Sequence, residues 1–342
     1  MNMKMKAVHI QKPGQVSLVE LNKAAPAAGD LLLRLRYVGF CGSDLSTYLG
    51  KNPLVAYPRV PGHEISARIE AVGKKVPDGF VPGEAVTVVP YTSCGACPSC
   101  RRGRSNACEH NQTLGVQRDG AMQEYLSVPW QKGLKAPGLG EKELAMVEPL
   151  TVGFHAIERG RVSASDIVMV LGCGMIGAGA IISAVQKGKF VVAVDVDDYK
   201  LELAAELGAQ YTINSRILDL HAEVQNLTDG RGPDVVVEAA GNPLTYQTAV
   251  REVAFTGRVV CIGYAGNEVP LATKLFVQKE LDILGSRNAA PEDFSRVIEY
   301  LEKETFPTDR MLSRVVPAAS AGQALADWAG DPGKVMKILV AF

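Results

Sequence analysis

The sequence has no excess of charge of either sign, since its 342 residues include 36 Lys and Arg and 37 Asp and Glu. A balanced chain has no long-range field to attract nucleic acid or an anionic membrane, so we expect a small-molecule partner instead. The first ten residues, MNMKMKAVHI, also lack the continuous apolar run and the small-residue cleavage site of a secretory signal. We therefore expect a cytoplasmic protein.

The chain shows no internal repeat and no low-complexity segment, and its length exceeds one ordinary core, so two domains are expected. Residues 1–150 are rich in short β-type runs such as LLLRLRYVGF, broken by Pro and Gly, which predicts a small barrel or sandwich. From about residue 166, apolar runs alternate with helical stretches, which predicts a parallel sheet with crossover helices. The tail contains a helix, PEDFSRVIEYLEKE, and ends on a strand, KVMKILVAF. The predicted fold class is thus α/β together with β.

Residues 167–186 carry no charge and are long enough to span a bilayer. Within them, LGCGMIG supplies Gly172, Gly174 and Gly177 in G-x-G-x-x-G spacing, after a predicted strand and at the start of a helix. The first glycine allows the tight turn, the second lets a pyrophosphate approach the backbone, and the third lets the helix pack close to the strand. The alternatives are a glycine-rich turn in a sheet that binds no nucleotide, and a membrane helix.

Asp195 closes the next predicted strand, where a carboxylate accepts hydrogen bonds from the adenosine ribose hydroxyls. Asp197 and Asp198 follow, and three carboxylates there would repel a 2′-phosphate, so NAD is favoured over NADP. The candidate cofactor-binding residues are Gly172, Gly174, Met175, Ile176, Gly177, Asp195 and Gly263.

Four of the seven cysteines lie in the stretch SCGACPSCRRGRSNACEH, namely Cys94, Cys97, Cys100 and Cys108. Their C-x2-C-x2-C-x7-C spacing can bring four thiolates around one tetrahedral zinc ion. Disulfides fit poorly in a reduced compartment, and a redox C-x-x-C pair would leave the other two cysteines unexplained. Unligated thiols are the remaining alternative. Four protein ligands would leave no open coordination position, so this zinc would be structural.

Three short motifs from distant parts of the sequence also contain possible metal ligands: GFCGSDLS with Cys41, PRVPGHEI with His63 and Glu64, and VEPLTVGFHA with Glu148. Singly each has an ordinary interpretation, because a lone cysteine is usually a small buried residue. Together with the glycine loop and the cysteine lobe, they resemble the zinc-containing medium-chain dehydrogenases, in which these motifs occur in this order. Glutamate in VEPL resembles the polyol and threonine dehydrogenase branch. The stretches YPRVPGHE, DGAMQEYLSVP and GSRNAAPEDF are most similar to the L-galactonate and L-gulonate 5-dehydrogenases.

The resemblance implies a GroES-like β-barrel catalytic domain over residues 1–150, which carries the structural zinc lobe and is completed by residues 290–342. It implies a Rossmann NAD-binding domain over residues 151–289, with the active site between the two. It also implies two zinc ions per chain and a homo-oligomer, either a dimer or a tetramer.

The same resemblance implies a catalytic zinc held by Cys41, His63 and a carboxylate. Either Glu64 binds the metal directly and Glu148 acts through water, or the reverse holds. Asp44 would then orient His63 from behind.

The resemblance further implies that Ser43 passes the proton of the activated substrate hydroxyl outward while the hydride moves to the nicotinamide. Many relatives have histidine where this chain has Ser46, so water or a ribose hydroxyl would complete the proton relay.

The predicted function is therefore an NAD-dependent, zinc-dependent dehydrogenase of a sugar acid, acting at the C5 hydroxyl of L-galactonate or L-gulonate. The alternatives are a sorbitol-type polyol dehydrogenase, an L-threonine 3-dehydrogenase, and a catalytically silent dinucleotide-binding protein. A sugar-acid carboxylate needs a cation, and the candidates are Arg59, Arg118 and Arg287, each of which could instead form a surface or interdomain ion pair. We expect structural roles for Cys173, Cys261 and His155.

Overall fold

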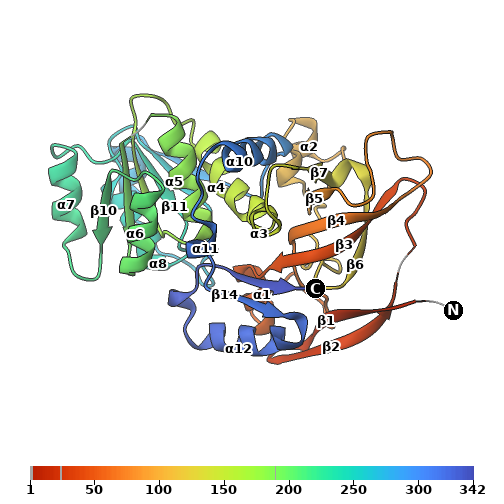
Figure 1. The fold of residues 1–342 in the computed structure, drawn as a ribbon. Coiled ribbons are helices and arrows are strands. Elements are labelled where there is room, and N and C mark those ends of the chain that lie inside the picture. The colour runs from red at the N-terminus through yellow and green to blue at the C-terminus, as the bar shows by residue number, and fades with distance from the viewer. Residues whose placement is uncertain (1–2, 24, 189) are drawn as a thin grey trace. The chain divides into compact units, whose positions relative to one another are not determined.

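The computed structural model describes residues 3–23, 25–188 and 190–342, and it divides into two compact units (Figure 1). The first unit comprises Met1–Glu148 and Phe294–Phe342, and the second comprises Pro149–Asp293. The tail of the chain therefore returns to the unit that contains its beginning.

The first unit is built on strands that form a hairpin and a larger mixed sheet. Its described residues give a seven-stranded sheet in the order β14-β15-β3-β4-β5-β7, with β6 also paired to β3, and β1 and β2 form the hairpin. The strands are β1 (Lys4–Lys12), β2 (Gln15–Asn22), β3 (Asp30–Gly39), β4 (Glu64–Val72), β5 (Ala85–Val88), β6 (Tyr125–Pro129), β7 (Gly133–Lys135), β14 (Arg314–Pro317) and β15 (Ile338–Ala341).

Short helices connect these strands. They are α1 (Gly42–Tyr48), α2 (Pro98–Arg101), α3 (Glu141–Leu144), α11 (Thr308–Met311) and α12 (Ala321–Gly330), with the single turns η1 (Ser105–Ala107), η2 (Trp130–Lys132), η3 (Ala318–Ser320) and η4 (Pro332–Lys334). Two longer helices, α4 (Val147–Arg159) and α10 (Pro291–Lys303), contain the points where the chain passes from one unit to the other.

The core of the first unit follows from the alternating pattern of β3. Leu31, Leu33 and Leu35 point to one face of the strand and are all buried. Full burial of each such side chain contributes about 1.5–3 kcal/mol. The final strand, β15, then pairs antiparallel with the end of β3, with Leu339 opposite Gly39. This pairing carries the C-terminus to the segment that follows β3, where Cys41 lies.

The second unit contains, in its described part, a six-stranded parallel sheet in the order β10-β9-β8-β11-β12-β13. The continuous apolar runs of the sequence form its inner strands, as expected for a sheet covered on both faces. The strands are β8 (Ile167–Leu171), β9 (Phe190–Asp195), β10 (Tyr211–Asn214), β11 (Val235–Glu238), β12 (Arg258–Cys261) and β13 (Asp282–Gly285), and the helices are α5 (Met175–Gln186), α6 (Asp198–Glu206), α7 (Leu220–Leu227), α8 (Pro243–Glu252) and α9 (Lys274–Gln278).

The strand order reverses between β8 and β11, so this sheet is doubly wound, and its ligand position is the crevice at the carboxyl ends of the strands. The predicted fold class, a β unit of the GroES-like kind with a Rossmann unit, is confirmed by this pair of sheets.

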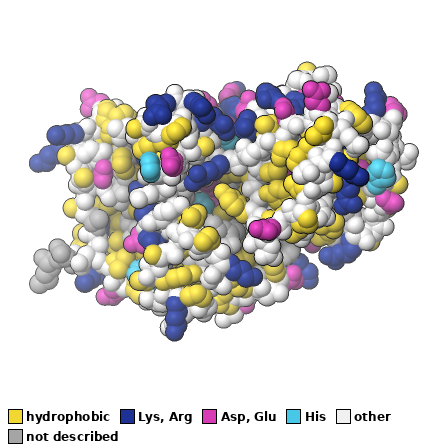
Figure 2. Space-filling model, turned by 180° about the vertical axis from the view of Figure 1, so that it is seen from behind, with side chains coloured by type: hydrophobic (Ala, Val, Ile, Leu, Met, Phe, Trp, Pro, Cys, Tyr) yellow, Lys and Arg dark blue, Asp and Glu magenta, His cyan; other side chains and the backbone are white. Residues whose placement is uncertain are grey.

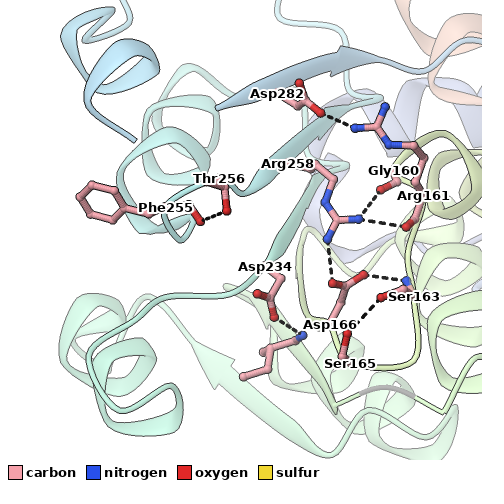
Figure 3. Close-up of polar contacts among 11 residues, drawn as sticks. Gly160, Arg161, Ser163, Ser165, Asp166, Asp234, Phe255, Thr256, Arg258 and Asp282 are labelled. Atoms are coloured by element: carbon pink, nitrogen blue, oxygen red, sulfur yellow. Dashed lines mark hydrogen bonds and ion pairs between the residues drawn. The ribbon is translucent and has the colours of Figure 1, made fainter. Parts of the chain in front are cut away.

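Polar contacts fasten the opposite end of the doubly wound sheet, where the strands begin (Figure 3). The Arg258 guanidinium pairs with Asp166 at 2.7 Å and donates to the carbonyls of Gly160 and Arg161 at 3.0 and 2.9 Å. Asp234 accepts the amide of Ile167 at 2.7 Å, which joins the start of β8 to β11. These contacts leave the carboxyl ends of the strands available for a ligand.

The uncharged segment 167–186 is divided into strand β8 and helix α5. Among the described residues, no helix is both long and apolar enough to cross a membrane. On the face drawn in Figure 2, cationic and anionic side chains are interspersed, as the balanced composition leads one to expect.

Candidate active site and metal centres

The glycine turn lies between β8 and α5 and has the geometry that the motif predicts. Gly172 has φ +95°, a conformation that side-chain-bearing residues rarely adopt. Gly174 is the N-cap of α5, with open space around the position of a Cβ, and Met175 and Ile176 begin the helix. A Cβ on Gly177 would overlap the carbonyl oxygen of Gly172. The turn therefore presents the free N-terminus of α5 at the carboxyl end of the sheet, where a pyrophosphate can bind.

Asp195 ends β9 beside this turn. One carboxylate oxygen accepts the Cys173 amide at 2.7 Å, and the other accepts the amides of Val196 and Asp197 at 2.7 and 3.1 Å. These bonds hold the carboxylate against the glycine turn. Because a carboxylate has about four acceptor positions, it retains capacity for a ribose hydroxyl.

Gly263 follows β12, two strands away from the glycine turn. A Cβ at this position would overlap the backbone of Gly241 and approach the Glu238 carboxylate. The residue thus permits close packing of two loops at the carboxyl edge of the sheet.

The four lobe cysteines come together around one point. Cys94, Cys97, Cys100 and Cys108 each offer a sulfur atom, and the four atoms lie within 4.8 Å of one another. The amides of Cys94 and Cys97 donate to the sulfurs of Cys108 and Cys94, both at 3.3 Å. The Cys100 and Glu109 amides lower the pKa of Cys97 to about 5, whereas burial and the neighbouring thiols raise the pKa of Cys100 to about 11. Four thiolates can be ionised together only if a cation compensates them, so this donor set fits zinc.

Replacing one lobe thiol tests this site. We expect Cys100→Ser to lose one zinc ion per chain and to lower the thermal unfolding midpoint, because a structural zinc contributes directly to folding free energy. Metal analysis and thermal unfolding measure both effects. The matched control is Cys261→Ser. This variant removes a thiol that belongs neither to the cysteine lobe nor to the predicted catalytic zinc site, so the zinc content should be unchanged. Unchanged zinc in Cys100→Ser would refute the assignment.

A second group of ligand atoms lies on segments that are distant in the sequence. Cys41, His63 and Glu64 offer one sulfur, nitrogen or oxygen atom each, and these atoms lie within 4.8 Å of one another. Burial alone would lower the pKa of His63, but Cys41, Glu148 and Asp44 together raise it well above its ordinary value. His63 Nδ1 is buried and has no hydrogen-bond partner among the described residues. An imidazole that lies beside a thiol and among carboxylates fits a cation ligand.

Asp44 fixes the backbone around the two metal-ligand candidates. The fully buried carboxylate accepts the Cys41 amide at 2.9 Å and the Gly62 amide at 3.2 Å. Burial raises the pKa of Asp44, while His63 and the two amides oppose that rise. We expected this carboxylate to orient the His63 ring; its hydrogen bonds instead go to backbone amides, and it acts on His63 through charge.

Glu148 is the second carboxylate near this group. It lies at the start of α4, is buried, and accepts a hydrogen bond from the Tyr91 hydroxyl. Burial and the Glu148 charge raise the pKa of Tyr91 well above its ordinary value, so the hydroxyl stays protonated and donates.

Glu64 is held by a lysine from the other end of the chain. Lys337 Nζ contacts both Glu64 oxygens at 2.6 Å and donates to the carbonyl of Phe40 at 3.0 Å. The side chains of this pair are 4% and 1% exposed. Burial raises the pKa of Glu64 to about 7 in spite of the lysine. A Cβ on Gly39 would overlap the Glu64 carboxylate, so glycine is required at the end of β3.

Ser43 lies in the first turn of α1, next to Cys41. Its Oγ is buried and has no hydrogen-bond partner among the residues described. A buried hydroxyl without a partner can accept and donate a proton to a bound substrate. Ser46 lies one turn further along the same helix.

The three candidate arginines have different surroundings. Arg59 pairs with Asp119 at 3.0 Å. Arg287 lies in the second unit, just past β13, and is engaged in an interaction of its own. Arg118 is partly buried, and in the described part of the chain its guanidinium has neither a hydrogen bond nor an ion pair.

The residues for which we expected structural roles lie in the second unit. His155 Nδ1 contacts the buried Asp293 carboxylate at 2.8 Å, which joins α4 to α10. Cys173 is 2% exposed, and Cys261 is the last residue of β12.

Three polar residues of the first unit were not among the site residues predicted from the sequence: Tyr91, Lys132 and Lys337. Lys337 lies within the apolar run KVMKILVAF. This position could have been recognised from the sequence, because a charged side chain in a buried strand segment needs a partner of opposite charge. Tyr91 and Lys132 gave no comparable signal.

A doubly wound sheet with a glycine turn and a terminal aspartate defines a dinucleotide-binding unit, and the Cys–His–Glu group adds a metal-type centre. This combination is compatible with a metal-dependent dehydrogenase, in which the nucleotide carries the hydride and the metal centre holds the substrate. The chain belongs to the zinc-type alcohol dehydrogenase family: residues 27–138 match the alcohol dehydrogenase GroES-like domain, and residues 176–303 match the zinc-binding dehydrogenase domain.

Similar proteins cover nearly the whole chain. L-galactonate-5-dehydrogenase of Escherichia coli K12 is 32% identical over 93% of this chain and 94% of its own. The 2-dehydro-3-deoxy-L-galactonate 5-dehydrogenase of Pseudoalteromonas atlantica is 35% identical over 95% of both chains. The crystal structure of short chain alcohol dehydrogenase (rspB) from E. coli CFT073, complexed with NADH, matches with a TM-score of 0.90 and 32% identity over 99% of both chains. The chain is therefore an enzyme of the dehydrogenase class.

Proposed function

We propose that the chain oxidises a secondary alcohol of a sugar acid with NAD, at the C5 hydroxyl of L-galactonate or L-gulonate. The observation that carries the proposal is the Cys41–His63–Glu64 donor group, in which Cys41 is partly exposed and the other two are buried, with the orphan Ser43 hydroxyl beside it. The names of two relatives, both 5-dehydrogenases of galactonate-type acids, support the substrate class.

The residues that would hold the catalytic zinc are Cys41, His63 and Glu64, since their ligand atoms are mutually close. Zinc bound there would supply a Lewis acid that lowers the pKa of the substrate hydroxyl. Lys337 sets the position of the Glu64 carboxylate. Glu148, held by Tyr91, adds a negative charge next to His63.

Ser43 is the proposed acceptor of the substrate proton, because its Oγ has a vacant acceptor position in an otherwise buried site. With serine at position 46, the proton would pass on to water or to a ribose hydroxyl of the cofactor.

The proposed cofactor is NAD, with its pyrophosphate at Gly174 and the N-terminus of α5 and its ribose at Asp195. The carboxylates of Asp195, Asp197 and Asp198 lie in succession at the end of β9 and the start of α6, where they would repel a 2′-phosphate. The nicotinamide C4 would receive the hydride from the carbinol carbon.

The test is a nucleotide-reduction screen of the zinc-loaded protein. We expect L-galactonate or L-gulonate to give the highest kcat/KM with NAD, and little reduction of NADP. Sorbitol, galactitol and L-threonine are the comparison substrates. Efficient turnover of sorbitol or L-threonine without turnover of either aldonate would contradict the sugar-acid assignment.

Zinc content distinguishes the enzyme from the silent dinucleotide-binding alternative. Two zinc ions per chain are expected for the enzyme, whereas one ion, lost on mutation of the cysteine lobe, would favour the silent protein. Retention of Cys41, Ser43, His63 and Glu148 together argues for the enzyme, because binding alone needs none of them.

A further inference from the structure

The loop over residues 113–120 is fixed against the backbone that leads into His63. The Gly120 amide donates to the carbonyl of Val60 at 2.8 Å, and the Ala121 amide donates to the carbonyl of Gly62 at 2.9 Å. A Cβ on Gly115 would overlap the backbone nitrogen of Gly62. The loop that carries Arg118 is therefore held beside a metal-ligand candidate.

Lys132 ends the turn η2 and approaches the same region from another part of the sheet. Its carbonyl accepts the Val89 amide at 2.9 Å, and the carbonyl of Pro90 accepts the Leu114 amide at 3.1 Å. Lys132 and the loop thus flank residues 89 and 90, and this segment leads directly to Tyr91, the partner of Glu148.

The two cations lie close enough to affect each other, and no acid compensates them. Burial lowers the pKa of Arg118, and burial together with the Arg118 charge lowers the pKa of Lys132. Arg118 Nε is buried without a hydrogen-bond partner. Over the described residues, no carboxylate pairs with either side chain.

Asp119, the next residue after Arg118, does not supply the missing negative charge. One of its oxygens accepts Arg59 Nη1 at 3.0 Å and the Val60 amide at 3.1 Å. Two neighbouring cations that are partly removed from water without a counter-charge are costly in free energy, and a bound anion would offset that cost.

We propose that Arg118 and Lys132 form an anion subsite that binds the carboxylate of the sugar-acid substrate; this inference rests on the function proposed above. Arginine offers a planar fork that can bind both carboxylate oxygens, and lysine adds a compact charge. The subsite selects an aldonate over the neutral polyol of the same length, because the polyol would leave both cations unpaired.

The test compares Arg118→Ala and Lys132→Ala with the wild type on L-galactonate and on galactitol. Each substitution should raise KM for L-galactonate about tenfold to a hundredfold, the range expected for loss of a charge-assisted hydrogen bond. The values of kcat and of KM for galactitol should change by less than about twofold, because the reacting carbon does not contact these cations. Calorimetric titration with L-galactonate in the absence of NAD should show the same loss of affinity.

Two further variants complete the design. Arg118→Lys keeps a charge and should restore part of the affinity for L-galactonate. Arg34→Ala removes an exposed arginine on β3 of the same unit and should change nothing. Thermal unfolding of each variant identifies any loss of folded protein.

The outcomes are distinct. An aldonate KM within twofold of wild type in both alanine variants would overturn this inference and leave the proposed function standing. An equal rise of KM for galactitol would also overturn it, because the loop would then act through the shape of the site. A wild type that oxidises neither aldonate would overturn both proposals.

Discussion

His63→Ala is expected to abolish turnover and leave NADH binding nearly unchanged. The substitution removes the buried imidazole of the Cys41–His63–Glu64 group. Loss of a Lewis acid costs several kcal/mol of transition-state stabilisation, which corresponds to about a thousandfold or more in kcat/KM. The glycine turn and Asp195 belong to the other unit, so the proposed dinucleotide contacts should be unaffected. Steady-state kinetics, zinc analysis and titration of NADH fluorescence measure the three quantities.

The matched control is His110→Ala, which removes an exposed histidine of the same unit. This variant should keep its activity and its full zinc content. If His63→Ala retained more than about a tenth of the wild-type kcat/KM, the metal at this position would not be the Lewis acid.

Lys337→Met is expected to destabilise the protein strongly. The lysine and Glu64 form an ion pair with 4% and 1% of the side-chain surfaces exposed, and the lysine also satisfies the carbonyl of Phe40. Removing one partner of a buried pair leaves an uncompensated charge and costs about 3–5 kcal/mol. Thermal and denaturant unfolding, with and without zinc, measure the loss, and zinc bound at Glu64 should offset part of it.

Two variants make this result interpretable. Lys142→Met breaks the exposed pair with Asp309 and should cost no more than about 1 kcal/mol. The double variant Lys337→Met/Glu64→Gln removes both charges and should recover part of the stability lost in the single variant when the two are compared without zinc, since Glu64 is also a proposed zinc ligand. A single variant as stable as wild type would mean that the pair does not hold this part of the unit together.

The fold class could be predicted from the sequence because its signals are local. The alternating leucines of β3 and the continuous apolar runs of β8 and β11 specify which faces are buried, and burial decides the type of sheet. Helices α1, α9 and α12 were not predicted. Gly42–Tyr48 and Lys274–Gln278 are too short for a clear helical period, and α12 is rich in alanine and glycine, which give a weak apolar stripe.

The sequence by itself determined the cysteine lobe and the glycine turn, because their groups lie within a few residues of one another and the spacing alone sets the geometry. It also supplied the ligand candidates Cys41 and His63, with either Glu64 or Glu148 as the carboxylate. The tertiary structure alone decided which groups surround them. Lys337 reaches Glu64 across 273 positions of sequence, and Tyr91 reaches Glu148 across 57. The pairing of β15 with β3 places Lys337 beside Glu64, and the path of the chain after β5 places Tyr91 beside Glu148. No local sequence pattern encodes such contacts, because the segments meet only when the sheet forms.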